Sequence, residues 1–196
     1  MALAVRFFVL SACALSAMAN DVAIEGCSSQ ARSIWDILKK DVEYDMLRWN
    51  LDTKFGSNIT CLSSTTTAIE KGKLEVGQRV TYLENGENRT IYQEYLVDAT
   101  DNKTMETTRY TSLPHARYTF DFVGENCAVV KVTDVNGLDS TASKRSDGKA
   151  QEKYYTLWVK HSDVRQPEEC CEKYFKAKCS GTTQEVYDPN KCNTGS

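Results

Sequence analysis

The chain has 196 residues, of which 41% are hydrophobic, and its 24 basic and 27 acidic side chains give a formal net charge of -3. This length and composition predict one domain with a real hydrophobic core, and the absence of excess positive charge argues against a nucleic-acid-binding protein. The only two histidines are His115 and His161, which gives little support for a histidine-rich metal centre. We expect neither a metal nor a cofactor.

The first 20 residues have the pattern of a secretory signal peptide. Arg6 precedes an apolar run over residues 7–15, and Ala17-Met18-Ala19 forms an A-x-A-like cleavage site. The apolar run is shorter than the roughly 20 residues that a membrane-spanning helix needs, so no membrane anchor is expected. The prediction is a secreted protein whose residues 21–196 form a single domain.

Of the eight cysteines, Cys13 lies in this leader and seven remain in the mature chain. They are Cys27, Cys61, Cys127, Cys170, Cys171, Cys179 and Cys192. An odd number in an oxidising compartment predicts three structural disulfides with one thiol left over, or fewer disulfides. Three N-x-Thr sequons begin at Asn58, Asn88 and Asn102, and they predict glycans on surface turns.

The first predicted element is a short amphipathic helix over residues 28–44, where apolar side chains recur every three to four positions. From residue 58 to residue 133, short runs of threonine, valine, tyrosine and phenylalanine between polar turns indicate strands. The predicted strands are 60–68, 74–83, 89–96, 105–111, 116–123 and 127–132. Asn85-Gly86 and residues 124–126 predict hairpin turns.

Residues 133–153 are expected to form an exposed loop, followed by a strand over 154–160, a helix over 168–178 and a short strand over 184–187. Seven or eight consecutive antiparallel strands with a helix at each end indicate an all-β fold, an eight-stranded up-and-down barrel. The interior of such a barrel can hold one small ligand.

No catalytic site is predicted. The chain has no G-x-S-x-G, H-E-x-x-H or glycine-rich phosphate loop, and its two histidines lie in unlike contexts. His115 is interpreted as a turn or rim residue, and the acidic groups near Asp134 and at Glu168-Glu169 as solvated surfaces. We therefore expect that the protein is not an enzyme.

Aromatic residues occur in almost every predicted element. They are Trp35, Trp49, Tyr82, Tyr92, Tyr95, Tyr110, Tyr118, Tyr154, Tyr155 and Trp158. Tyrosine and tryptophan combine an apolar body with a polar group, so a barrel lined with them is suited to a small amphipathic molecule. Each single ring is better explained as part of the core, and the argument for a ligand depends on the rings taken together.

Several motifs taken together resemble the tick salivary lipocalins, a group that includes the tick histamine-binding proteins. These motifs are the secretory leader, the QARSIW segment at 30–35, Thr60-Cys61, the NCAVV segment at 126–130, the YTLWV segment at 155–159, and Cys170-Cys171 followed by Cys192. The resemblance covers essentially the whole mature chain. It implies a disulfide-stapled lipocalin barrel with a carboxy-terminal helix, secreted in saliva, that captures small host mediators during blood feeding.

The resemblance also implies a disulfide pairing. Cys61 would pair with Cys192, Cys127 with one member of the Cys170-Cys171 pair, and Cys27 with the other. Cys179 is then left over as a possible intermolecular thiol in an otherwise monomeric protein. A bridge that uses Cys179 in place of Cys192 stays open as an alternative.

The resemblance is weaker at the positions that would bind an amine. Histamine-binding relatives carry acids where this chain has Ser33, Thr156 and, counting back from Cys127, about Arg117. Trp35 and Trp158 remain, and acids nearby at Asp36, Glu94 and Asp121 can substitute for the missing ones. The candidate ligand-binding residues are therefore Trp35, Asp36, Tyr92, Glu94, Arg117, Asp121, Thr156 and Trp158.

Three ligand hypotheses follow. The default from the resemblance is a biogenic amine such as histamine or serotonin. An inward-pointing Arg117 would instead favour a lipid mediator, such as a leukotriene or fatty acid, or a neutral sterol. Alternation alone does not decide whether the face of Arg117 or that of Tyr118, Phe120 and Phe122 is the inner one. The third hypothesis is an immunomodulator that binds a host immune protein through loops such as 133–153.

Overall fold

The computed structural model describes residues 24, 26, 27, 32–50, 58–108, 116–133, 154–179 and 182–192. Its elements are α1 (Ile34–Ile37), β1 (Glu43–Trp49), β2 (Ile59–Glu70), β3 (Glu75–Glu84), β4 (Glu87–Val97), β5 (Thr104–Thr107), β6 (Arg117–Val123), β7 (Cys127–Thr133), β8 (Tyr154–Lys160), a 3-10 helix η2 (His161–Asp163), α2 (Glu169–Lys178), β9 (Gln184–Glu185) and α3 (Pro189–Cys192). Within these ranges, no helix is long and apolar enough to cross a membrane.

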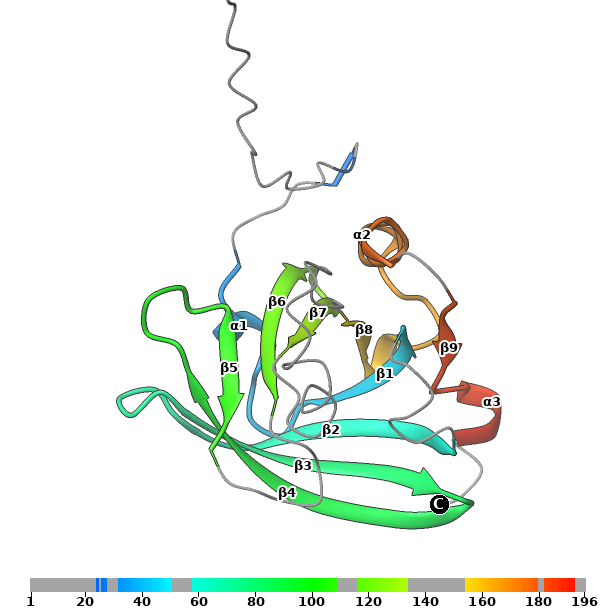
Figure 1. Ribbon diagram of the computed structural model, residues 1–196, viewed down its shortest axis with the longest axis horizontal. Coiled ribbons are helices and arrows are strands. Elements are labelled where there is room, and N and C mark those ends of the chain that lie inside the picture. Colours follow the sequence, from blue (N-terminus) through cyan, green and yellow to red (C-terminus); the bar gives the residue numbers. More distant parts are fainter. Residues whose placement is uncertain are drawn as a thin grey trace, which may run out of the picture.

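The strands form a closed antiparallel barrel (Figure 1). Each strand from β2 to β8 pairs with its neighbours in sequence, β8 pairs with β1, and β1 pairs with β2 through Glu43–Asp45 to close the ring. The short strand β9 pairs with the far end of β1. The predicted eight-stranded barrel is therefore confirmed, and every predicted strand is present with its ends moved by a few residues.

The predicted amino-terminal helix is wrong in its extent. Of the described residues 32–44, only Ile34–Ile37 is helical, held by a capping box between Ser33 and Asp36. The chain then turns through Asp41, which has a φ of 60°, and enters β1 at Glu43. The helical spacing of apolar residues ends there, because β1 places the alternate side chains Tyr44 and Met46 in the barrel and, after a bulge between Met46 and Arg48, Trp49.

The two ends of the barrel differ. Helix α1 lies at the end that holds the β4–β5 and β6–β7 connections, where the Ile34 N–H donates to the Asn102 carbonyl and an Arg32 Nη1–H to the Gly124 carbonyl. The strands that flank residues 51–57, 109–115 and 134–153 end at the opposite side, together with the β3–β4 hairpin. The predictions for the leader, for His115, for Asp134 and for loop residues 134–153 lie outside the described residues.

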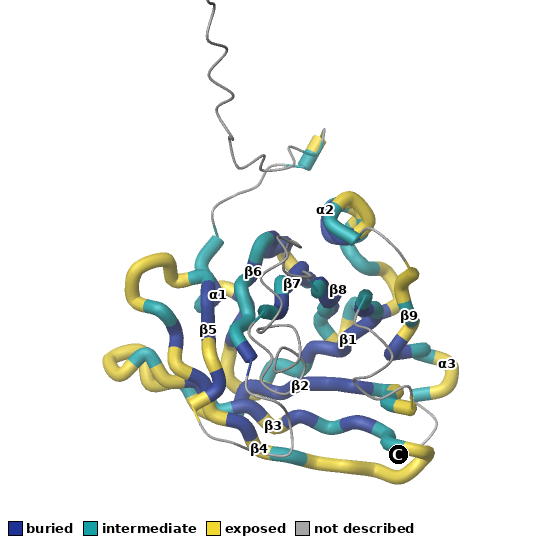
Figure 2. Tube along the Cα trace, in the orientation of Figure 1, coloured by how far each residue is buried: buried dark blue, intermediate teal, exposed yellow. Residues whose placement is uncertain are grey.

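The sequons occupy both ends. Asn58 and Asn88 lie near the β3–β4 hairpin, and Asn102 lies in the β4–β5 connection. All three residues are exposed. The chain is also exposed along the β3–β4 hairpin and over most of the β4–β5 connection (Figure 2). Their positions are compatible with attached glycans.

Helix α2 covers the outer face of β6, β7 and β8 (Figure 1). Its buried side chains Tyr174 and Phe175 pack with Val129 and Leu157, which point out of the barrel. A bulge between Phe120 and Phe122 turns the Phe122 ring to this outer layer, where it stacks on Tyr174 with 5.1 Å between centroids. The barrel wall is therefore buried on both sides here, which explains the continuous apolar composition of β7 and β8.

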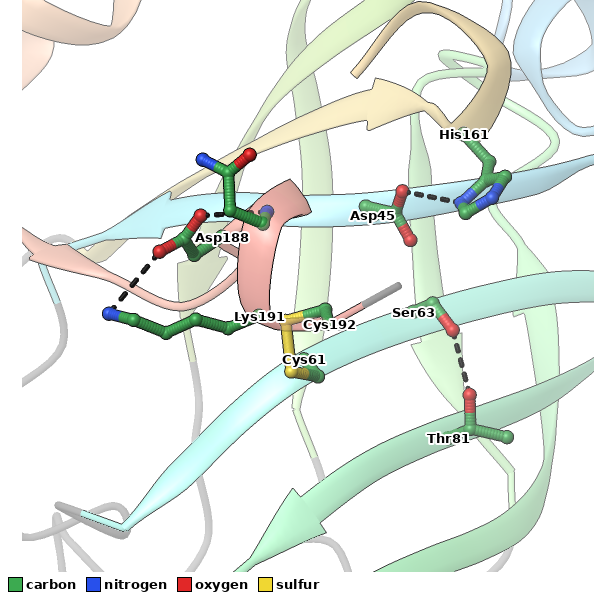
Figure 3. The surroundings of a disulfide bond; sticks show 9 residues. Asp45, Cys61, Ser63, Thr81, His161, Asp188, Lys191 and Cys192 are labelled. Carbon is green, nitrogen blue, oxygen red and sulfur yellow. Dashed lines mark hydrogen bonds and ion pairs between the residues drawn. A yellow bond between two sulfur atoms is a disulfide. The ribbon is translucent and has the colours of Figure 1, made fainter. Parts of the chain in front are cut away.

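Three disulfides fasten this architecture. They join Cys27 to Cys170, Cys61 to Cys192 and Cys127 to Cys171. This arrangement matches the pairing that the resemblance implied, and it assigns Cys171 to Cys127. The Cys61–Cys192 disulfide holds the carboxy-terminal segment, with α3, against β2 (Figure 3).

Cys179 is the free cysteine of the described residues, and it lies half-buried at the end of α2. Burial raises the pKa of its thiol to about 11. The thiolate is the reactive form, so it should be scarce at pH 8 and grow as the pH rises towards 11. We expect alkylation of the native mature chain at pH 8 to be about 100-fold slower than alkylation of the same chain in guanidinium chloride, because the pKa lies about two units higher. Equal alkylation rates for the native and the denatured chain, measured by iodoacetamide labelling and mass spectrometry, would contradict the burial of Cys179.

Candidate functional site: the barrel cavity

The barrel encloses a cavity of about 160 Å³. Ile37 and Leu38, at the end of α1, contribute to the lining at one end, and side chains from β1 to β8 form the wall. The aromatic part of the wall consists of Tyr44, Trp49, Tyr95, Tyr118, Phe120 and Trp158. The remainder is mostly aliphatic, and includes Met46, Leu62, Val80, Met105, Ala128 and Val130.

Four residues of the lining have polar groups that are paired with one another or with the backbone: Ser64, Gln78, Thr156 and Trp158. Ser64 Oγ donates to Gln78 Oε1 at 3.0 Å. Trp158 Nε1 donates to Thr156 Oγ1 at 2.9 Å, and this hydroxyl donates to the Val130 carbonyl at 3.3 Å. Thr156 therefore fixes the orientation of the Trp158 indole.

Tyr95 and Tyr118 meet edge to face within the barrel, with 5.7 Å between ring centroids. Burial raises the pKa of Tyr118 to about 12 and that of Tyr95 well above its usual value. Both phenols are therefore uncharged hydrogen-bond donors at neutral pH. Within the described part of the chain, neither hydroxyl has a hydrogen-bond partner.

The described part of the lining carries no charged side chain. Among the described residues, no aspartate, glutamate, lysine, arginine or histidine lines the cavity. An ion that entered this space would lose its hydration without gaining a counter-charge, which is strongly unfavourable. The cavity is therefore suited to an uncharged molecule with a largely apolar surface.

Two of the eight candidate ligand-binding residues, Thr156 and Trp158, line the cavity. Asp36 is outside the lining: its exposed carboxylate accepts a hydrogen bond from the Ser33 N–H at 2.9 Å as part of the α1 cap. Trp35, the second residue of α1, is also outside the lining: its ring packs against the core, and the ammonium group of Lys71 lies 5.7 Å from it.

Tyr92 and Glu94 are also outside the lining, because they lie on the outer face of β4. Tyr92 is 69% exposed and Glu94 is also exposed, whereas Gln93 and Tyr95 between and beside them are buried. The alternation in β4 is clear in the sequence, but it does not tell which phase is internal.

The inner face of β6, which alternation left open, belongs to Tyr118 and Phe120, so Arg117 and Asp121 lie outside the lining. Arg117 Nη2 lies 3.0 Å from Asp98 Oδ2 on the outside of the barrel. Asp121 lies 3.9 Å from the ammonium group of Lys131. With Arg117 outside, the lining offers no cation for a carboxylate-bearing lipid.

Sequence reasoning missed part of the lining. Tyr44 was missed because it was assigned to the end of a helix, and Met46 because no strand was predicted for residues 45–49. The polar residues Ser64, Thr66 and Gln78 were missed because nothing singled them out within β2 and β3. The sequence signal for these polar residues is their spacing. Ser64 and Thr66 lie two positions apart on one face of β2, where Ser64 is opposite Val80 of β3 and Thr66 is opposite Gln78.

Comparisons with known proteins agree with this architecture. The family model of the tick histamine binding protein matches residues 25–194. The crystal structure of AM182 in complex with serotonin aligns with a TM-score of 0.57 and 16% identity, over 83% of this chain and 95% of that one. Japanin from Rhipicephalus appendiculatus, bound to cholesterol, aligns with a TM-score of 0.53 and 11% identity, over 78% of this chain and 97% of that one. No curated protein matches the sequence.

Proposed function

This chain belongs to the tick histamine-binding protein family, and we propose that it is a secreted, non-enzymatic lipocalin that captures a small uncharged molecule in its barrel. The ligand would be a host mediator, sequestered by saliva during blood feeding. The observation that carries the choice of ligand is the lining of the cavity, in which no described residue is charged.

Charge distinguishes the small-molecule candidates: an amine carries a cation, a fatty acid or leukotriene carries a carboxylate, and a sterol is uncharged. Removing an ammonium group from water without a paired carboxylate costs several kcal/mol. Cation–π contacts with Tyr44, Trp49 or Trp158 would return only about 0.5–2 kcal/mol each. The same argument applies to a fatty acid or leukotriene, because Arg117 is engaged by Asp98 outside the cavity. An uncharged ligand has neither cost.

The polar groups of the lining suggest what the ligand carries. The rings of Tyr95 and Tyr118 lie against each other and both line the cavity, and Gln78 adds an amide whose Nε2 has no partner in the described residues. These groups can hydrogen-bond to a hydroxyl or carbonyl oxygen on an otherwise apolar body. A sterol, such as the cholesterol bound to Japanin, or a smaller neutral indole has this chemistry.

The test is a matched pair of ligands that differ only in charge. Serotonin, the molecule in the AM182 complex, is compared with 5-hydroxytryptophol, which has the same ring system and a hydroxyl in place of the amine. We expect calorimetric titration to give a Kd for 5-hydroxytryptophol at least about tenfold lower than that for serotonin, which corresponds to about 1.4 kcal/mol. Cholesterol is titrated in parallel to test a larger neutral ligand.

A variant provides the control for charge. Thr156→Glu places a carboxylate beside Trp158 inside the cavity, so it should shift the preference towards serotonin by about tenfold or more. Circular dichroism checks that the variant folds. Equal or tighter binding of serotonin by the unmodified chain would overturn the proposal of an uncharged ligand.

We further propose cleavage of the leader after residue 19 or 20 and glycans at Asn58, Asn88 and Asn102. Support comes from the exposure of all three asparagines at the ends of the barrel. The protein secreted by a eukaryotic host should lose apparent mass on treatment with an N-glycosidase. Unchanged gel mobility would contradict the glycans.

A further inference from the structure

Three ionisable side chains meet on the outer surface of the barrel, away from the cavity. Glu43 and Asp45 alternate along β1 with Tyr44 and Met46, which line the cavity, so their side chains point outwards. β8 is the neighbour of β1, with Lys160 opposite Tyr44, and His161 follows directly. The register of the two strands therefore brings His161 beside both carboxylates (Figure 3 shows Asp45 and His161).

The three side chains are close enough to share one ligand. His161 Nδ1 lies 2.8 Å from Asp45 Oδ2, and one potential ligand atom from each of Glu43, Asp45 and His161 lies within 4.8 Å of the others. Asp45 is fully buried, at 0% exposure, and its second oxygen, Oδ1, has no hydrogen-bond partner among the described residues. A buried carboxylate oxygen is unfavourable without a partner, which an ion or a water molecule can provide.

The charges around this point are not balanced. In the part of the chain that the structure describes, neither Glu43 nor Asp45 has a lysine or arginine partner. Asp163 is a further acid in the 3-10 helix η2 that begins with His161, and the phenol of Tyr187 faces the same carboxylates. Burial raises the pKa of Asp45 to about 6 against the opposing effect of its hydrogen bond to His161. A bound cation would supply positive charge that no described lysine or arginine provides here.

We propose that Glu43, Asp45 and His161 form a binding site for a divalent transition-metal ion, for which Zn²⁺ is the best match. An imidazole nitrogen and two carboxylate oxygens are three of the ligands that Zn²⁺ accepts, and water completes four-coordination. The imidazole favours zinc over calcium and magnesium, which prefer oxygen ligands alone. A single histidine is enough for this site.

The geometry requires only small adjustments: ligand atoms that lie up to 4.8 Å apart move closer, and His161 Nδ1 and Asp45 Oδ2, which are 2.8 Å apart, separate slightly. Bonds of about 2.0–2.2 Å in a tetrahedral zinc site place ligand atoms about 3.4 Å apart. The side chain of His161 is 45% exposed and Glu43 is half-buried, so both are free to approach the fixed Asp45 carboxylate. The bound ion would tie β1 to the end of β8.

The experiment is a calorimetric titration of the mature chain, free of affinity tags, with Zn²⁺ in chelator-free buffer. We expect one Zn²⁺ per chain, and binding at least about tenfold weaker in Glu43→Gln and in His161→Gln. Both positions are at least partly exposed, so these variants should keep the fold, which circular dichroism checks. The absorption spectrum of bound Co²⁺ gives a second readout of nitrogen and oxygen ligation.

Two variants serve as matched controls. Glu185→Gln removes an exposed carboxylate from β9, which also pairs with β1, and His115→Gln removes the other histidine of the chain. Both should bind Zn²⁺ as the unmodified chain does. The proposal is overturned if Zn²⁺ does not bind, if Glu43→Gln and His161→Gln bind it unchanged, if His115→Gln abolishes binding, or if Ca²⁺ binds as tightly.

Discussion

The Ala128→Phe variant is expected to lose ligand binding by about 100-fold or more. Ala128 is fully buried in β7, lines the cavity and lies opposite Trp158 of β8. A phenyl ring at this position occupies the space that a ligand needs in a cavity of about 160 Å³. Because the ring and the ligand cannot be in the same place, the loss appears as affinity, measured by titration with 5-hydroxytryptophol or cholesterol.

The variant must be shown to fold. Overpacking of a core position costs about 1–3 kcal/mol, which the ring recovers in part by filling the empty space. Thr90→Phe is the matched control, because Thr90 is exposed on the outward face of β4 and the same ring there does not reach the cavity. Binding that survives in a folded Ala128→Phe protein would place the ligand outside the barrel.

Removal of the Cys127–Cys171 disulfide is expected to have the largest effect on stability. Both cysteines are fully buried and join β7 to α2 across a sequence separation of 44. In the double variant Cys127→Ala/Cys171→Ala, the unfolded chain gains freedom and the outer layer loses two buried side chains. We expect the free energy of unfolding to fall by about 2–5 kcal/mol. For a chain of this length, the Tm should fall by roughly 5–20 °C.

The Cys27–Cys170 disulfide provides the comparison. It ends on the same helix, but both of its cysteines are only half-buried. Cys27→Ala/Cys170→Ala should therefore lower the Tm less than the Cys127 pair, because no buried space is emptied. Calorimetric melting of both variants decides the order, and an unchanged Tm for Cys127→Ala/Cys171→Ala would contradict the role of this disulfide.

The barrel itself was predictable because its signal is local and repeated. Alternating runs between turns mark β2 to β8, and an antiparallel sheet of this length closes on itself. The strand that completes the ring, β1, was not predicted, because Ile34 and Leu38 have helical spacing and this period was extended through Tyr44. Val42 fits either period, so the change at Glu43 is not visible locally.

The residues that line the cavity were less predictable, because an alternating pattern does not show which of its two faces points into the barrel. Arg117 and Tyr118 are equally good candidates for the interior of β6 until pairing with β7 and packing of α2 are known. The bulge after Phe120 then reverses the phase, so that Phe122 faces α2 instead. Tertiary packing thus selects the lining.

The cluster of Glu43, Asp45 and His161 could not be predicted from the sequence, for a related reason. Glu43 and Asp45 are separated from His161 by more than 100 positions, and only the register between β1 and β8 brings His161 to them. An unpredicted β1 leaves that register unknown. Nothing in the sequence therefore indicated that Asp45 and His161 lie side by side.

The most direct test of an uncharged ligand is a competition measured by native mass spectrometry. The mature protein is equilibrated with equal concentrations of cholesterol, 5-hydroxytryptophol, palmitate, serotonin and histamine, and the masses of the intact complexes are recorded. The uncharged lining predicts complexes with cholesterol or 5-hydroxytryptophol as the main bound species, absent in Ala128→Phe. A spectrum dominated by serotonin, histamine or palmitate would contradict it.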